Sequence, residues 1–169
     1  MRRLILFRHA KAESRVAEGG DAERPLADRG RSDAALVARR LADAGLAPDL
    51  ALVSCARRAR ETWDLAAPAF PKARVEIRDD LYNADADEIL AELDGKAEAA
   101  ETVMVVGHNP SLQELAVTLL IEGGAPPGDI ERVSAGFPTA TAAALAIDPA
   151  GRAALDGLFH ARDGREEEG

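Results

Sequence analysis

The stretch Leu4-Ile5-Leu6-Phe7-Arg8-His9 decides the fold of this chain. It opens with four consecutive apolar residues, enough for a short strand. A continuous rather than alternating apolar run indicates a strand covered on both faces, as in a parallel sheet. Two other runs share this character, Leu50–Val53 and Val103–Val106. The sequence therefore predicts a mostly parallel sheet built on these three strands.

Helical patterns alternate with the strands, at residues 34–41, 56–67, 85–93 and 112–120. The last of these has the clearest helical spacing of apolar residues; Asn109 is placed to cap it, and Pro110 fits its first position. Weaker strand patterns lie at residues 75–77, 141–147 and 154–160. Strands that alternate with helices predict a three-layer α/β domain, in which helices flank a mostly parallel central sheet.

The composition limits the classes of partner. The chain has the length of one domain, 169 residues, which we expect to span residues 1–162, with an acidic, disordered tail at 163–169. Thirty acidic residues against 21 basic ones give a net charge of −9, which disfavours binding to nucleic acid or an anionic membrane. The single cysteine, Cys55, excludes an internal disulfide and suits the cytoplasm, where we expect the protein to act.

Arginine or histidine side chains follow all three continuous apolar runs: Arg8 and His9 follow the first, Arg58 the second, and His108 the third. Ligands of open α/β sheets bind outside the carboxyl ends of the strands, so we expect these side chains to converge. Guanidinium groups match the oxygens of a dianionic phosphoryl group, and a neutral imidazole can act as a nucleophile. Each of these residues alone is weak evidence for a site. Because all four follow buried strands, a shared phosphoryl-binding site is favoured over the alternative that each residue has a separate structural role.

Other residues that could carry chemistry are not accompanied by further site residues in the sequence. His160 stands alone and is expected to be structural. Cys55 would serve a Cys-x5-Arg phosphatase loop only with an arginine at position 61, which is Glu61. The chain has three histidines, no HExxH or CxxC motif and no glycine-rich nucleotide loop. We therefore expect neither a metal nor an organic cofactor.

Four ordered motifs resemble the histidine phosphatase superfamily, which includes the phosphoglycerate mutases. Its Arg-His-Gly hallmark is similar to Arg8-His9-Ala10, and its Gly-His-Asn pattern stands at 107–109. Its Leu-Thr-x-x-Gly-x-x-Gln-Ala segment is matched loosely at 26–34, and its Ser-x-x-x-Arg-Ala-x-Gln-Thr pattern resembles residues 54–62. The order and spacing agree from residue 3 to about residue 147. The resemblance implies a phosphoglycerate mutase-like fold.

The same resemblance implies roles for individual residues. His9 would be the nucleophile that becomes phosphorylated, while Arg8, Arg58 and His108 would bind the phosphoryl group and stabilise the transition state. Weaker candidates for lining the substrate pocket are Lys11, Ser14 and Asn109.

Within the superfamily, the chain most resembles the short SixA-type phosphohistidine phosphatases, through residues 8–12, 81–84 and 137–139. Many phosphomonoesterases of the superfamily place a glutamate general acid where Asn83 stands, and Asp80 and Asp85 are the nearby alternatives. An imidazole leaves more readily than an alkoxide and needs less protonation. The resemblance therefore implies hydrolysis of phosphohistidine on a protein. The alternatives are a phosphomonoesterase acting on a small phosphorylated metabolite and an inactive phosphate- or phosphoprotein-binding module.

Overall fold

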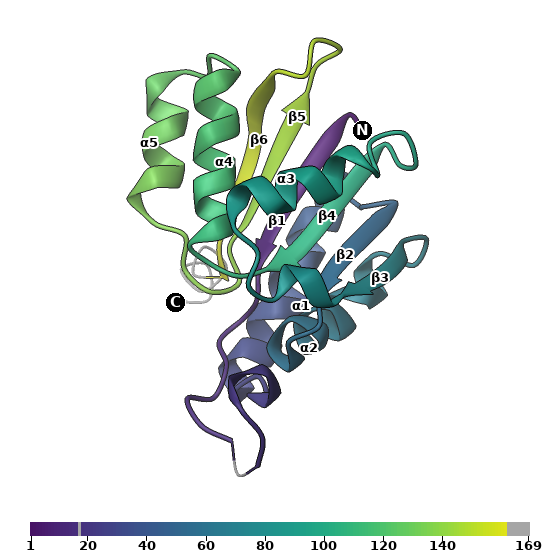
Figure 1. Cartoon of the computed structure of the whole chain (residues 1–169), viewed down its shortest axis with the longest axis vertical. Coiled ribbons are helices and arrows are strands. Elements are labelled where there is room, and N and C mark those ends of the chain that lie inside the picture. The colour runs from purple at the N-terminus through teal and green to yellow at the C-terminus, as the bar shows by residue number, and fades with distance from the viewer. Residues whose placement is uncertain (17, 162–169) are drawn as a thin grey trace.

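The computed structural model describes residues 1–16 and 18–161, and it forms a six-stranded sheet with helices on both faces (Figure 1). The strands are β1 (Arg3–Arg8), β2 (Leu50–Ser54), β3 (Arg74–Arg78), β4 (Thr102–Gly107), β5 (Ala142–Ile147) and β6 (Ala153–Phe159). The α-helices are α1 (Asp28–Asp43), α2 (Arg57–Ala66), α3 (Ala86–Asp94), α4 (Ser111–Glu122) and α5 (Pro127–Ala135). Three short 3-10 turns are η1 (Asp21–Glu23), η2 (Ala67–Ala69) and η3 (Asp79–Leu81). The predicted tail at 163–169 lies outside the described residues.

The strand order is β3-β2-β4-β1-β5-β6. The first four strands in this order run parallel, and β5 and β6 add an antiparallel edge beside β1. The predicted α/β class and mostly parallel sheet are confirmed. The three strands that the apolar runs indicated, β1, β2 and β4, lie side by side in its centre.

Alternate side chains of β1 enter two separate cores, which makes the domain three-layered. Ile5 and Phe7 pack with α1 and α2 on one face of the sheet. Leu4 and Leu6 pack with α3, α4 and α5 on the other face. All four side chains are fully buried. A strand covered on both faces reads as a continuous apolar run, which is why β1 could be recognised in the sequence.

Two helical features differ from the expectations. Helix α5 was not expected, because its only buried residue is Val133 and its apolar spacing is correspondingly weak. Helix α4 begins at Ser111 with Pro110 in the N-cap position, so the placement of the cap at Asn109 is wrong by one residue. The Asn109 side chain still accepts a hydrogen bond from the Gln113 backbone N–H, at 3.3 Å. No helix within residues 1–16 and 18–161 has the length and apolar character needed to cross a membrane.

The first turn of α1 presses against the chain just after the predicted nucleophile. The Lys11 carbonyl accepts a hydrogen bond from the Ala27 N–H at 2.9 Å. A β-carbon added at Gly30 would lie 2.0 Å from the same carbonyl oxygen. Only glycine permits this approach, because the neighbour is backbone and cannot rotate away. Gly30 thereby fixes the path of residues 9–11.

We predict that Gly30→Ala lowers the free energy of unfolding by about 2 kcal/mol, as overpacking does in a closed core. It should also displace the segment that carries Lys11, because that backbone must shift to make room for the β-carbon. Chemical denaturation measures the first effect. The matched control is Gly128→Ala in α5, where an added β-carbon meets nothing within 4 Å. Equal stabilities of the two variants would contradict the close contact at Gly30.

Candidate active site

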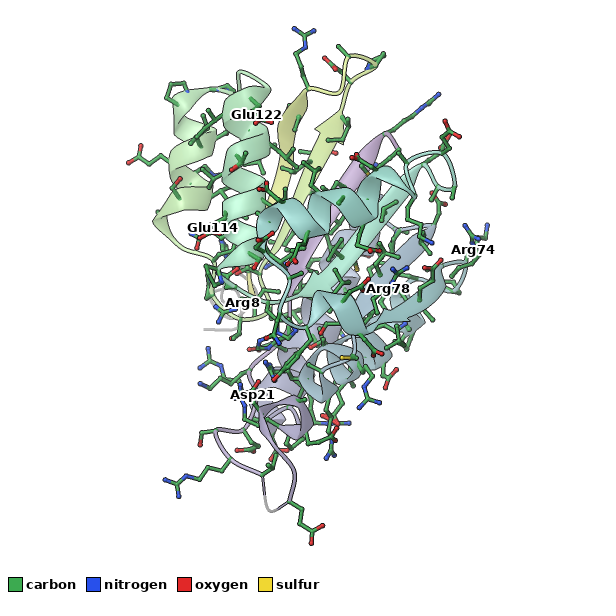
Figure 2. All side chains as sticks on the ribbon, viewed as in Figure 1. Arg8, Asp21, Arg74, Arg78, Glu114 and Glu122 are labelled. Atoms are coloured by element: carbon green, nitrogen blue, oxygen red, sulfur yellow. The ribbon has the colours of Figure 1, made fainter. Side chains whose placement is uncertain are left out.

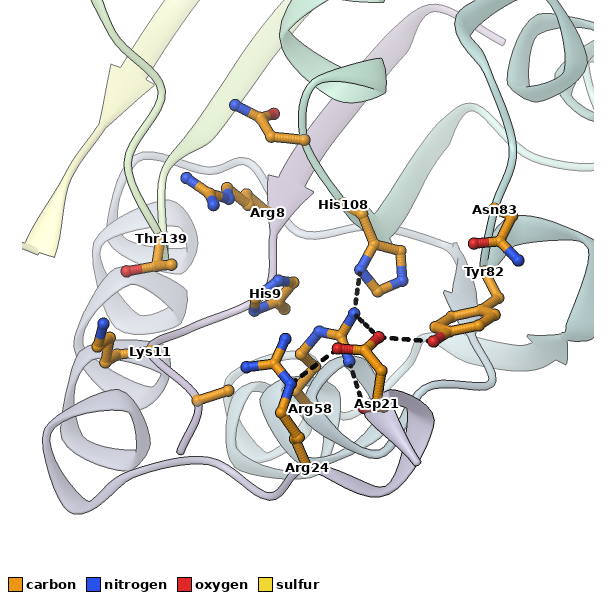
Figure 3. A pocket seen from close by; sticks show the side chains of 12 residues that line it. Arg8, His9, Lys11, Asp21, Arg24, Arg58, Tyr82, Asn83, His108 and Thr139 are labelled. Atoms are coloured by element: carbon orange, nitrogen blue, oxygen red, sulfur yellow. Dashed lines mark hydrogen bonds and ion pairs between the residues drawn. The ribbon is translucent and has the colours of Figure 1, made fainter. Parts of the chain in front are cut away.

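The register between β1 and β4 places the two site histidines next to each other. Arg8 pairs with Gly107 at the end of the ladder, and the His9 N–H donates to the Gly107 carbonyl at 3.0 Å. His9 and His108 therefore follow directly at the carboxyl ends of adjacent strands. Their ring centroids are 5.3 Å apart (Figure 3).

The surroundings of His9 fix which ring nitrogen is free. Nδ1 lies 2.8 Å from the Ala10 carbonyl oxygen, which can only accept, so Nδ1 carries the proton. Nε2 therefore keeps its lone pair. Burial lowers the pKa of His9 to about 3, against the effect of the Ala10 hydrogen bond and with smaller contributions from His108, Arg58 and Arg8. At neutral pH the ring is uncharged, as a nucleophile must be.

His108 is held in the opposite tautomer. Its Nε2 lies 2.8 Å from the hydroxyl of Ser54, the last residue of β2. Its Nδ1 faces the Arg58 Nη2, a donor, at 3.5 Å, so Nδ1 is the acceptor and Nε2 carries the proton. Burial, with a smaller contribution from Arg58, lowers the pKa of His108 to about 4, while Asp21 acts in the opposite direction. The second imidazole is therefore also neutral in the unliganded protein.

The two arginines offer buried donors that have no acceptor. Arg8 donates from Nη1 to the Phe137 carbonyl at 2.9 Å, and Arg58 donates from Nη1 to the Asp21 carbonyl at 2.9 Å. The Nε atoms of both residues are buried and have no hydrogen-bond partner among the described residues. Both guanidinium groups line the same cavity. Two guanidinium groups in one cavity suit a dianionic phosphoryl group, because their forked N–H donors match its oxygens.

Asp21 links the two sides of the cavity. Its carboxylate accepts hydrogen bonds from the Tyr82 hydroxyl at 2.6 Å, from Arg24 Nε at 2.9 Å and from Arg58 Nη2 at 3.1 Å. The Tyr82 hydrogen bond is the largest of the causes that lower the pKa of Asp21 to about 2. Asp21 is consequently ionised throughout the neutral range, and its proton is not available for transfer.

These side chains surround a cavity of about 390 Å³. Twelve residues line it: Arg8, His9, Lys11, Ala12, Asp21, Arg24, Arg58, Tyr82, Asn83, His108, Asn109 and Thr139. Six of them are expected site residues, namely the central four with Lys11 and Asn109. Among the residues that the structure describes, no three His, Cys, Asp or Glu side chains come together as a metal site.

Three expected site residues lie elsewhere. Ser14 lines a neighbouring depression and not this cavity. Asp80 is paired with Arg78 at 3.0 Å, and Arg78, the last residue of the edge strand β3, lies apart from Arg8 and Asp21 (Figure 2). Asp85 caps α3, where its carboxylate accepts the Glu88 N–H at 2.9 Å. Both aspartates have structural partners of their own, and neither lines the cavity.

Other lining residues were not expected in the site. Asp21 and Arg24 belong to the long connection between β1 and α1, and the length of this connection is the signal in the sequence that points to function. Tyr82, Asn83 and Thr139 lie in segments that carry the family resemblance, and the structure adds them to the lining of the cavity. His160, expected to be structural, contacts the Thr141 hydroxyl at 2.9 Å and lies outside the cavity lining.

Comparison with known proteins identifies the family. Residues 4–90 match the model of the histidine phosphatase superfamily (branch 1). An uncharacterised protein of Mycobacterium tuberculosis is 35% identical over 145 residues, covering 83% of this chain and 87% of that protein. The chain belongs to the histidine phosphatase superfamily.

Solved structures place the chain near the SixA-type branch of that superfamily. A protein from Agrobacterium tumefaciens, provisionally named phosphohistidine phosphatase SixA, is 30% identical with a TM-score of 0.82, over 94% of this chain and 97% of that one. A protein from Nakamurella with the same provisional name is 32% identical with a TM-score of 0.80, over 94% and 95% of the two chains. The resemblance read from the motifs is confirmed at the level of family and fold.

We predict that both active-site imidazoles stay neutral to unusually low pH in the phosphate-free protein. Because burial disfavours the charged ring, the nitrogen NMR signals of His9 and His108 should remain those of neutral imidazole down to about pH 5. Added inorganic phosphate should raise both pKa values, since its charge opposes that of the arginines. A midpoint near the ordinary histidine value for either ring in the phosphate-free protein would contradict this electrostatic description.

Proposed function

We propose that the protein is a phosphohistidine phosphatase, which removes the phosphoryl group from a histidine of a partner protein through a phospho-His9 intermediate. The observation that carries the proposal is the state of Asp21. It is the one carboxylate among the described residues that line the cavity, and it is held ionised by Tyr82 and two arginines. The cavity thus combines a free nucleophile with no carboxylic acid to protonate a leaving group.

In the first step, His9 Nε2 attacks phosphorus. The Nε2–P bond forms as the bond between phosphorus and the substrate nitrogen breaks, and the electron pair of that bond goes to the substrate ring. When the other ring nitrogen carries a proton, the ring departs as neutral imidazole. The guanidinium groups of Arg8 and Arg58, which both line the cavity, would hold the phosphoryl oxygens and stabilise the transition state.

In the second step, a water oxygen attacks the phosphorus of phospho-His9. The Nε2–P bond breaks, its electron pair returns to Nε2, and both protons of the water leave with the phosphate as H2PO4⁻. His9 is then neutral again, with Nδ1–H still donating to the Ala10 carbonyl. That hydrogen bond serves both steps, since it keeps the ring in the tautomer that attacks and receives its lone pair back.

The lack of an acid separates two substrate classes. An alcohol leaves as a strongly basic alkoxide unless it is protonated, whereas the conjugate acid of imidazole has a pKa of about 6.5. Phosphohistidine can therefore be cleaved in this cavity without proton transfer from a carboxyl group. The names of the two related SixA-type structures support the same class. We further propose that the protein acts in the cytoplasm, and that its substrate is a phosphorylated protein, not a small phosphorylated metabolite.

The direct test measures phosphate release from a phosphohistidine-bearing peptide and from a phosphomonoester. We expect the wild type to act at least about 100-fold faster on the peptide, because the monoester requires an acid that contributes about 10²–10⁴-fold. His9→Ala should abolish release.

Two results would overturn the proposal. Faster release from the monoester would favour a small-molecule phosphomonoesterase. No release from either substrate, together with tight binding of phosphate, would favour a binding module. The control variant is His160→Gln, which lies outside the cavity lining and should retain the wild-type preference between the two substrates.

A further inference from the structure

The cavity extends beyond the groups that hold the phosphoryl group. In an in-line displacement the leaving group departs on the side of phosphorus away from the attacking His9 nitrogen. It must therefore occupy the part of the cavity not taken by Arg8, His9, Arg58 and His108. Two walls are available there, Tyr82 with Asn83 on one side and Lys11 with Thr139 on the other (Figure 3).

The charge of the two walls differs. When the second ring nitrogen of a phosphorylated imidazole carries a proton, the ring itself is positively charged. This is the form from which neutral imidazole departs. The Lys11 ammonium repels such a ring. The opposite wall offers the aromatic ring of Tyr82 and the amide oxygen of Asn83. The ionised Asp21 lines the cavity beside this wall, 2.6 Å from the Tyr82 hydroxyl, where it pairs with the Arg24 and Arg58 cations. Cations are favoured by aromatic faces and carbonyl oxygens.

The Tyr82 wall is also preorganised. Its hydroxyl is fixed by Asp21, its ring meets His108 edge-on with centroids 5.8 Å apart, and the Arg58 guanidinium carbon lies 5.9 Å from the ring centroid. Asn83, the next residue, is exposed, lines the cavity and has no side-chain partner among the described residues. A fixed ring beside a free amide is an arrangement suited to a planar ligand with one N–H donor.

We propose that Tyr82 and Asn83 form the binding site for the departing imidazole ring. In this site the ring of the substrate histidine packs against Tyr82, and its second nitrogen donates an N–H to the Asn83 amide oxygen. Asn83 does not transfer a proton. It favours the protonated ring, from which the phosphoryl group moves to His9 most readily, and so selects an imidazole over other leaving groups. This inference rests on the proposed phosphohistidine phosphatase function.

The test uses the full chain, a phosphohistidine-bearing peptide as substrate and orthovanadate as a probe of the phosphoryl end alone. We expect Asn83→Leu to lower kcat/KM for the peptide about tenfold or more, the loss expected for one hydrogen bond to a charged group. The inhibition constant of orthovanadate should not change. Asn83→Asp should retain activity, because the carboxylate accepts the same N–H. Tyr82→Leu should lose more activity than Tyr82→Phe, since only Phe keeps the ring.

Lys11→Met is the matched control on the opposite wall. It removes a positive charge that attracts every anion, so it should weaken orthovanadate inhibition and peptide turnover together.

Two outcomes separate this inference from the function on which it rests. Wild-type turnover of the peptide with an unchanged kcat/KM in Asn83→Leu would overturn the leaving-group site and leave the proposed function intact. No wild-type release from the peptide would overturn both. Because Asn83 is exposed and unpartnered, Asn83→Leu and Asn83→Asp should both leave the fold intact, which chemical denaturation can verify.

Discussion

The register of β1 against β4 is the constraint on which the site depends. Arg8 pairs with Gly107, so His9 and His108 emerge together at one edge of the sheet. A slip by one residue would exchange the faces of Leu4 and Ile5, which belong to different cores. The packing that holds β1 in register therefore also sets the 5.3 Å separation of the two imidazoles. Core and active site are determined by the same contacts.

Electrostatics then set the chemical state of the site. The protein carries a net charge of −9, yet four cationic side chains line the cavity beside one carboxylate. Burial among these cations keeps both imidazoles neutral, which gives His9 its nucleophilic lone pair. The Tyr82 hydroxyl, together with two of these cations, Arg24 and Arg58, keeps Asp21 ionised. The electrostatics of the cavity thus leave His9 as a neutral nucleophile and Asp21 unable to donate a proton. Together these two states limit the leaving groups that can depart without being protonated by a carboxyl group.

Much of this could be predicted from the sequence because it depends on local patterns. Continuous apolar runs marked β1, β2 and β4, and the residues directly after them marked the two histidines and Arg58. The position of Asp21 could not be predicted, because it is fixed by contacts with Tyr82 and Arg58, which are 61 and 37 residues away. Asp80 and Asp85 were candidate acids by their distance along the chain alone. In the folded protein each is held by a local partner, Arg78 or the first turn of α3.

In the proposed reaction, His9 carries the phosphoryl group between substrate and water. Rapid mixing of the wild type with a phosphohistidine-bearing peptide, quenched in base and followed by mass spectrometry of the digested protein, tests it most directly. We expect a transient phosphoryl group on the His9 Nε2, acid-labile and base-stable, that forms as the peptide is consumed and decays as free phosphate appears. Phosphate release without any labelled His9, or a phosphoryl group found on His108 instead, would contradict it.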